Sequence, residues 1–136
     1  MSFREKSAWI TLVTVLVVFT AYFGALLTGR VEGFHSLYLL LISVIGLVAM
    51  QAGLHVIAVL TTPRDGRAPK DEREVAIQWR SQSIGYYVLT VFALALFVPV
   101  HSGHTALDMA NFALFAVAIA TVCVAVAQII MFRRGA

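Results

Sequence analysis

Four charge-free runs constrain the fold of this chain more than any other feature. Residues 7–29, 33–63, 81–107 and 109–132 contain no Asp, Glu, Lys or Arg, and they are 23, 31, 27 and 24 residues long. A helix needs about 20 mostly apolar residues to cross the roughly 30 Å hydrocarbon core of a bilayer, and every run reaches that length. The pattern predicts a membrane protein. It excludes a soluble enzyme, a DNA-binding domain, a disordered tail and a disulfide-stapled secreted module.

The fold class follows from the continuity of these runs. Strands of a membrane barrel alternate in polarity, whereas these runs are apolar throughout, so we expect helices. The predicted fold is all-α, an integral membrane four-helix bundle that forms a single domain over residues 1–136. The predicted spans are about Ala8–Thr28, His35–Leu60, Trp79–Val98 and Leu107–Phe132. The first span exceeds the apolar part of a cleavable signal peptide, about 7–15 residues, so we expect it to be retained.

The third span is expected to begin as a helix outside the membrane. Asp71 is a suitable N-cap and Glu74 follows three residues later, which is close to a capping box. The helix then runs without a break into the span, and Pro99 is expected to end it on the far side.

The basic residues predict the orientation of the spans, because cytoplasmic segments keep an excess of Lys and Arg. Nine of the ten lie on one side of the predicted membrane, and only Arg30 lies on the other. The nine are Arg4, Lys6, Arg64, Arg67, Lys70, Arg73, Arg80, Arg133 and Arg134. We therefore expect both termini and the central loop to lie in the cytoplasm, with the chain in the bacterial cytoplasmic membrane. This charge favours anionic lipid headgroups and requires no nucleic acid as a partner.

Polar side chains near the cytoplasmic boundary form the first candidate site. Gln51 and His55 share one face of the second span, and Glu74, Gln78 and Gln82 follow one face of the third helix. If these faces meet, they form either a water-accessible cavity with His55 as its titratable group, or hydrogen bonds that hold two helices together.

A second candidate site lies at the outer ends of the spans. His35, His101, His104 and Asp108 are plausible ligands of a divalent transition metal. The alternative interpretation is that the histidines are solvated loop residues and that Asp108 is an acidic residue in the first turn of a helix, where the helix dipole favours it.

The fourth span carries small residues at alternating spacings of three and four, which allow a neighbouring helix to approach closely. They are Ala113, Ala116, Ala120, Cys123 and Ala127. We call this set the small-residue seam. It can pack within the bundle or against a second copy of the chain, which would make a homodimer.

One short segment resembles known proteins. The stretch Asp71-Glu72-Arg73-Glu74, with Ile77 after it, resembles the segment that leads into the third helix of small, uncharacterised bacterial four-helix membrane proteins. The resemblance implies the fold and no activity. Small multidrug-resistance transporters are similar in size and helix number, but their essential glutamate in the first helix has no counterpart between Ser7 and Gly29.

The chemistry that the sequence lacks guides the functional prediction. It contains no phosphate-binding glycine loop, no nucleophile with an identifiable base, no pair of carboxylates within a span and no Asp or Glu in any of the four charge-free runs. We therefore expect a non-enzymatic accessory, regulatory or structural subunit. The alternatives are metal or small-ligand binding at the outer histidines, and transport of a small solute through the polar cavity.

Overall fold

The computed structural model describes residues 3–29, 34–61, 69 and 71–134. Within these residues the regular structure is entirely helical, with four long helices and one short helix, and no strand. The elements are α1 (Phe3–Leu27), α2 (Phe34–Thr61), α4 (Glu72–Ala95), α5 (Phe97–His101) and α6 (Ala106–Arg134). This confirms the all-α prediction. The basic residues Arg30, Arg64, Arg67 and Lys70 lie outside the described residues.

The four long helices match the four predicted spans. Each is long and apolar enough to cross a membrane, with α4 and α5 counting as one span over Glu72–His101. Three of them begin before their charge-free runs, α1 at Phe3, α4 at Glu72 and α6 at Ala106, because the polar residues there continue the helical hydrogen bonds, whereas α2 lies within its run.

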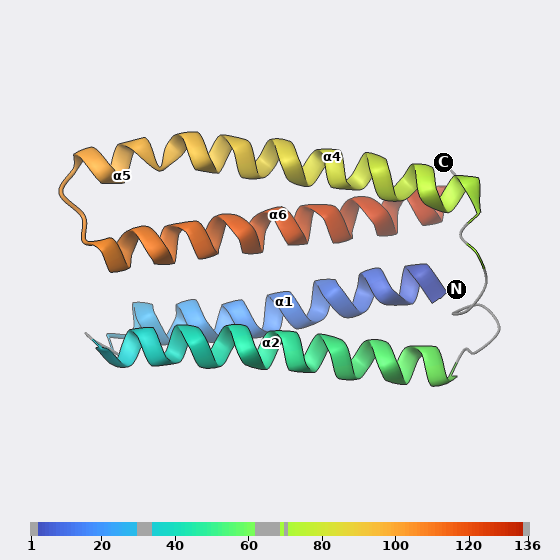
Figure 1. Ribbon diagram of the computed structural model, residues 1–136, viewed down its shortest axis with the longest axis horizontal. Coiled ribbons are helices and arrows are strands. Elements are labelled where there is room, and N and C mark those ends of the chain that lie inside the picture. Colours follow the sequence, from blue (N-terminus) through green and yellow to red (C-terminus); the bar gives the residue numbers. More distant parts are fainter. Residues whose placement is uncertain (1–2, 30–33, 62–68, 70, 135–136) are drawn as a thin grey trace. The chain divides into compact units, whose positions relative to one another are not determined.

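The helices form two compact hairpins, one over Met1–Lys70 and one over Asp71–Ala136. In the first, α1 and α2 lie side by side and run antiparallel (Figure 1). Near one end Ser7 contacts His55, and about two turns farther along α1 Thr14 contacts Gln51. Tyr22 and Val15 are almost completely buried, so apolar packing accompanies these polar contacts.

In the second hairpin, α4 and α6 are antiparallel neighbours (Figure 1). Gly85 lies at a close approach of the two helices, because a Cβ atom added there would overlap Cγ2 of Val124 and lie 3.7 Å from the carbonyl oxygen of Ala120. Toward the end of the hairpin that α5 closes, the ring of Phe92 packs at 6.0 Å between centroids against Phe112 and Phe115. A glycine and an alanine near the middle of the hairpin and aromatic rings nearer the α5 end therefore set the spacing of the two helices.

Pro99 interrupts the third helix without ending it, contrary to the sequence-based prediction. The regular hydrogen bonding of α4 stops at Ala95. In an uninterrupted helix the backbone N–H of residue 99 would donate to the carbonyl oxygen of Ala95, but proline has no N–H. The chain stays helical through Leu96 and continues as α5 to His101. Proline is tolerated because it falls in the first turn of α5, where backbone N–H groups have no helical partner. His101 is thus a helical residue, and the turn to α6 begins at Ser102.

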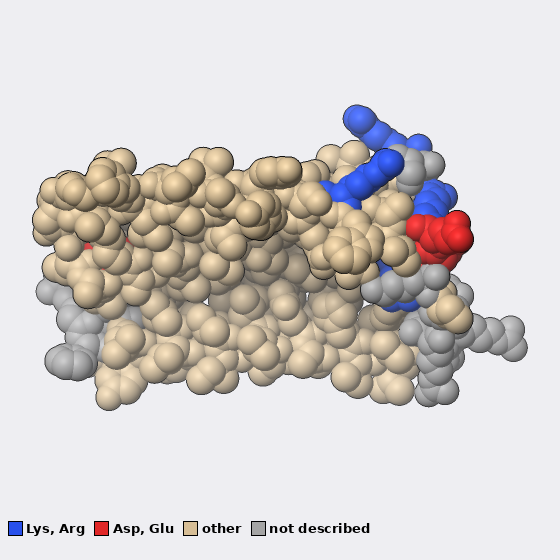
Figure 2. All heavy atoms as spheres, turned by 45° about the horizontal axis from the view of Figure 1, so that its top comes forward, with Lys and Arg blue, Asp and Glu red and all other residues tan. Residues whose placement is uncertain are grey.

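Charged side chains collect at one end of the α4–α6 hairpin. Since the helices are antiparallel, the start of α4 and the end of α6 lie together, and this end carries four arginines and three carboxylates. Figure 2 shows these side chains at that end, with uncharged residues covering the length of the hairpin. The four arginines are Arg73, Arg80, Arg133 and Arg134.

Candidate functional site

A polar contact between α1 and α2 contains the only histidine of the first candidate site. The Nδ1 atom of His55 lies 2.7 Å from the carbonyl oxygen of Gln51, one turn earlier on α2. A carbonyl oxygen only accepts, so Nδ1 carries the proton and Nε2 of the neutral ring is an acceptor. The hydroxyl of Ser7 lies 2.7 Å from Nε2 and donates to it. The histidine therefore has a fixed tautomer and a fixed ring orientation.

A second polar contact lies deeper in the same hairpin. The side-chain amide of Gln51 donates to the Thr14 hydroxyl over 3.3 Å. The Thr14 hydroxyl in turn donates within its own helix, to the carbonyl oxygens of Ile10 (2.8 Å) and Thr11 (3.1 Å). Thr14 is 3% exposed, so this contact belongs to the packed interior of the hairpin. These bonds satisfy polar groups that would otherwise face an apolar surrounding.

The Ser7–His55 pair has the geometry of a serine and its general base, a pairing that the sequence analysis did not find. The two residues are 48 positions apart, and nothing local marks Ser7. The same geometry is that of an ordinary hydrogen bond between helices. The Thr14–Gln51 bond, which repeats the connection about two turns along α1, favours this second interpretation. The bonds also end at backbone carbonyls, so they do not form a continuous path for a proton.

The polar residues of α4 have their described contacts within the α4–α6 hairpin. Ser81 is completely buried, and its hydroxyl accepts from the side-chain amide of Gln128 (3.1 Å) and donates to the carbonyl oxygen of Gln78 (2.9 Å). Gln128 is a partner that the sequence analysis missed, because it lies in an apolar stretch on the last span. Glu74 is half-buried and Gln82 is exposed.

The predicted cavity joins residues of the two hairpins. Gln51 and His55 belong to the first hairpin, and Glu74, Gln78 and Gln82 to the second. Within the first hairpin, both α2 residues already bond to α1. That the two polar faces meet stays a prediction.

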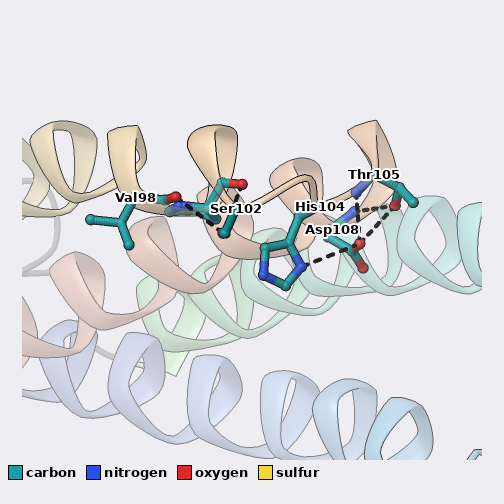
Figure 3. A network of polar contacts seen from close by, with 6 residues as sticks. Val98, Ser102, His104, Thr105 and Asp108 are labelled. Atoms are coloured by element: carbon teal, nitrogen blue, oxygen red, sulfur yellow. Dashed lines mark hydrogen bonds and ion pairs between the residues drawn. The ribbon is translucent and has the colours of Figure 1, made fainter.

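The outer end of the α4–α6 hairpin holds a capping box (Figure 3). Thr105 precedes the first residue of α6, and its backbone N–H and its hydroxyl both donate to Oδ2 of Asp108, over 2.9 and 2.8 Å. The Asp108 backbone N–H points back to the Thr105 hydroxyl at 3.3 Å. This reciprocal pattern satisfies backbone N–H groups at a helix start, with Asp108 at the third helical position. The carboxylate thus has the capping role that the sequence analysis considered as an alternative to metal binding.

The outer histidines are exposed and lie on different elements. Nδ1 of His104 is 3.8 Å from Oδ2 of Asp108, while Nδ1 of His101 lies 3.0 Å from the carbonyl oxygen of Phe97, and the rings of His101 and Phe97 are in tilted contact at 3.9 Å between centroids. His35 is the second residue of α2 in the first hairpin and is exposed. Among the described residues, no group of three His, Cys, Asp or Glu side chains is placed to hold a metal ion.

The small-residue seam is used, at least in part, within the α4–α6 hairpin. Ala120 lies under Gly85, and Ala116 and Ala120 are both buried. This contact favours packing within the chain for the middle of the seam. Self-association through Ala113, Ala116, Ala120 and Ala127 stays a prediction.

Comparison with known proteins adds no assignment. No protein-family model, curated protein or solved structure matches this chain.

Proposed function

We propose that this protein is a non-enzymatic, multi-pass protein of the bacterial cytoplasmic membrane that acts as an accessory or regulatory subunit, with both termini and the central loop in the cytoplasm. One observation carries the proposal. In the described part of the chain, side-chain hydrogen bonds join helix to helix inside both hairpins: Ser7–His55 and Thr14–Gln51 between α1 and α2, and Ser81–Gln128 between α4 and α6.

This use of polar residues argues for a scaffold rather than for chemistry. Ionisable groups inside a membrane are costly and are retained where they move ions, protons or substrates. The four charge-free runs contain no carboxylate, lysine or arginine. A chain of this kind contributes helical surface and a charged cytoplasmic end, which are the features of a subunit that associates with other membrane components.

The orientation is tested by labelling single cysteines in intact cells. The native Cys123 is first changed to Ser, since it is the only cysteine in the chain. A membrane-impermeant maleimide is expected to label Ser102→Cys from outside, and to label Glu72→Cys only after the cells are lysed. The reverse pattern would overturn the proposed orientation.

The accessory role is tested by comparing the native mass of the protein from two membranes. Solubilised in mild detergent from its own membrane, the chain is expected to migrate in a larger assembly with a second polypeptide at fixed stoichiometry. Expressed in an unrelated bacterium, it is expected to migrate alone or as a homodimer. The same small mass from both membranes would contradict an accessory role.

Self-association is a separate part of the proposal, supported by the length of the small-residue seam. In the Cys123→Ser background, Ala113→Cys and Ala127→Cys test whether the ends of the seam meet a second copy. A disulfide-linked dimer in native membranes is expected if they do. Its absence at both positions would leave the seam entirely to packing within the chain.

A further inference from the structure

We propose that one flank of the α4–α6 hairpin is a binding site for the phosphate group of an anionic phospholipid, formed mainly by Arg80 and Arg134. The inference rests on the proposed cytoplasmic position of this end of the hairpin. It goes beyond a general attraction of basic residues for the membrane, because it names one face and the side chains that form it.

The direction in which each α4 residue faces follows from contacts with α6. Ser81 and Gly85 face α6, through the Gln128 hydrogen bond and the close approach of Val124. Successive helical residues are rotated by about 100°, so Arg73 lies about 100° and Arg80 about 120° from the midline between Ser81 and Gly85, both toward the same side. They share one flank of the hairpin.

The carboxylates of α4 lie elsewhere around the helix. By the same rotation of about 100° per residue, Glu72 faces away from α6 and Glu74 faces toward it, while Asp71 is the extended N-cap residue that precedes the helix. The remaining acidic residue of this hairpin, Asp108, lies at its outer end. Within α4, the flank with Arg73 and Arg80 is therefore basic without an acidic residue among its members.

Arg134 of α6 falls on this same flank. Val124 is the residue of α6 that faces Gly85. Arg134 lies ten residues after Val124, so its direction around the α6 axis differs from that of Val124 by about 80° toward one side. Because α6 runs antiparallel to α4, this side and the side of Arg80 are the same. Arg133, one residue earlier, is rotated by about 180° and faces away from α4. Figure 2 shows the basic side chains gathered at this end of the hairpin.

The antiparallel arrangement brings the two guanidinium groups toward one another. Ser81 lies opposite Gln128, so Arg134 falls level with residue 75, about 7–8 Å along the axis from Arg80. Side chains on a helix tilt toward its N-terminus. Arg80 therefore leans toward the cytoplasm and Arg134 leans toward the membrane, and both side chains are exposed.

The chemistry of the flank fits a phospholipid. A guanidinium binds a phosphate through two parallel N–H donors, and all four basic residues of this hairpin's described part are arginines. Trp79, which is 69% exposed, adjoins Arg80 and has the amphipathic ring typical of the headgroup layer. Beyond the arginines the flank continues with Ile84 on α4 and Cys123 on α6, which gives an acyl chain an apolar surface.

The test uses Trp79 as a reporter of bound lipid. The chain has two tryptophans, so Trp9→Phe leaves Trp79 alone. The full-length protein is reconstituted in phosphatidylcholine vesicles that contain increasing fractions of a brominated lipid, which quenches a nearby tryptophan. Brominated phosphatidylglycerol is expected to quench at a severalfold lower mole fraction than brominated phosphatidylcholine.

Variants then separate a site from a diffuse charge. Arg80→Gln and Arg134→Gln are each expected to lower the preference for phosphatidylglycerol about fivefold, the effect of one arginine close to a membrane surface. Arg133→Gln removes the same charge one residue from Arg134 but on another face, and is expected to leave the preference unchanged. An equal loss of the phosphatidylglycerol preference in all three variants would contradict a defined site. It would indicate instead a general attraction between the basic end of the hairpin and anionic lipid.

Two further outcomes complete the experiment. Replacing chloride by inorganic phosphate at constant ionic strength is expected to leave quenching unchanged, and abolition of the preference would identify a free anion as the ligand instead. Flotation of the vesicles checks the premise. If the protein does not float with them, the proposed membrane function fails; if it floats but shows no lipid preference, the function stands and the site is overturned.

Discussion

The close approach at Gly85 gives the most sensitive test of the α4–α6 packing. A methyl group added by Gly85→Ala would overlap Cγ2 of Val124, a β-branched side chain with little rotameric freedom. Overpacking of this kind costs about 1–3 kcal/mol, while alanine is better than glycine in a helix by about 1 kcal/mol. We expect a net loss of about 1 kcal/mol in the free energy of unfolding.

The sign of this effect is expected to reverse when Val124 is also shortened. In a Val124→Ala background the overlapping methyl group is absent, so only the helix propensity remains and Gly85→Ala is expected to stabilise by about 0.5–1 kcal/mol. The four proteins of this cycle are unfolded by titrating sodium dodecyl sulfate into mild-detergent micelles, with the loss of helix followed by circular dichroism. An equal gain from Gly85→Ala in both backgrounds would refute the packing described here.

Gly46 provides the matched control for this cycle. It lies within α2, and nothing is within 4 Å of the Cβ position there. Gly46→Ala is therefore expected to stabilise by about 0.5–1 kcal/mol whether or not Val124 is changed. A loss of stability in this variant would mean that the assay reports something other than local packing.

Three other contacts make separate predictions. A double-mutant cycle of Ser7→Ala and His55→Ala is expected to show a coupling of about 1 kcal/mol in unfolding, whereas additive effects would mean that the hydrogen bond contributes nothing. Ser81→Ala is expected to cost up to about 1 kcal/mol, and to cost clearly less once Gln128→Ala has removed the partner amide. Thr105→Ala is expected to weaken the start of α6 by about 1 kcal/mol, seen as faster amide hydrogen exchange confined to its first turn.

The number, type and positions of the long helices could be predicted from the sequence. The charge-free runs are long, and in a bilayer every backbone polar group must bond within its own segment, so an apolar run of this length leaves only the helix. The error at Pro99 concerned a helix end. Proline was treated as a stop, but it stands where the first turn of α5 needs no N–H donor.

The roles of individual polar residues were only partly predictable. Asp108 was recognised as an acidic first-turn residue, but its reciprocal bonds with Thr105 were not. The expected capping box at Asp71 is present in position only, since Asp71 is the N-cap but makes no side-chain cap hydrogen bond. Asp71 with Glu74 and Thr105 with Asp108 have the same three-residue spacing. Whether the side chain of the N-cap residue bonds to the helix start depends on side-chain rotamers, which the spacing does not specify.

What the sequence by itself determined is therefore the set of helices and the separation of their charged ends from their apolar lengths. These features depend on whether each side chain is more stable in water or in an apolar surrounding, which is a property of the residue alone. Only the tertiary structure decided that Ser7 meets His55, that Ser81 meets Gln128 and that Gly85 lies against α6. Such pairings depend on which face of a helix turns toward its neighbour, and that is fixed by close packing between segments about 40 to 50 residues apart.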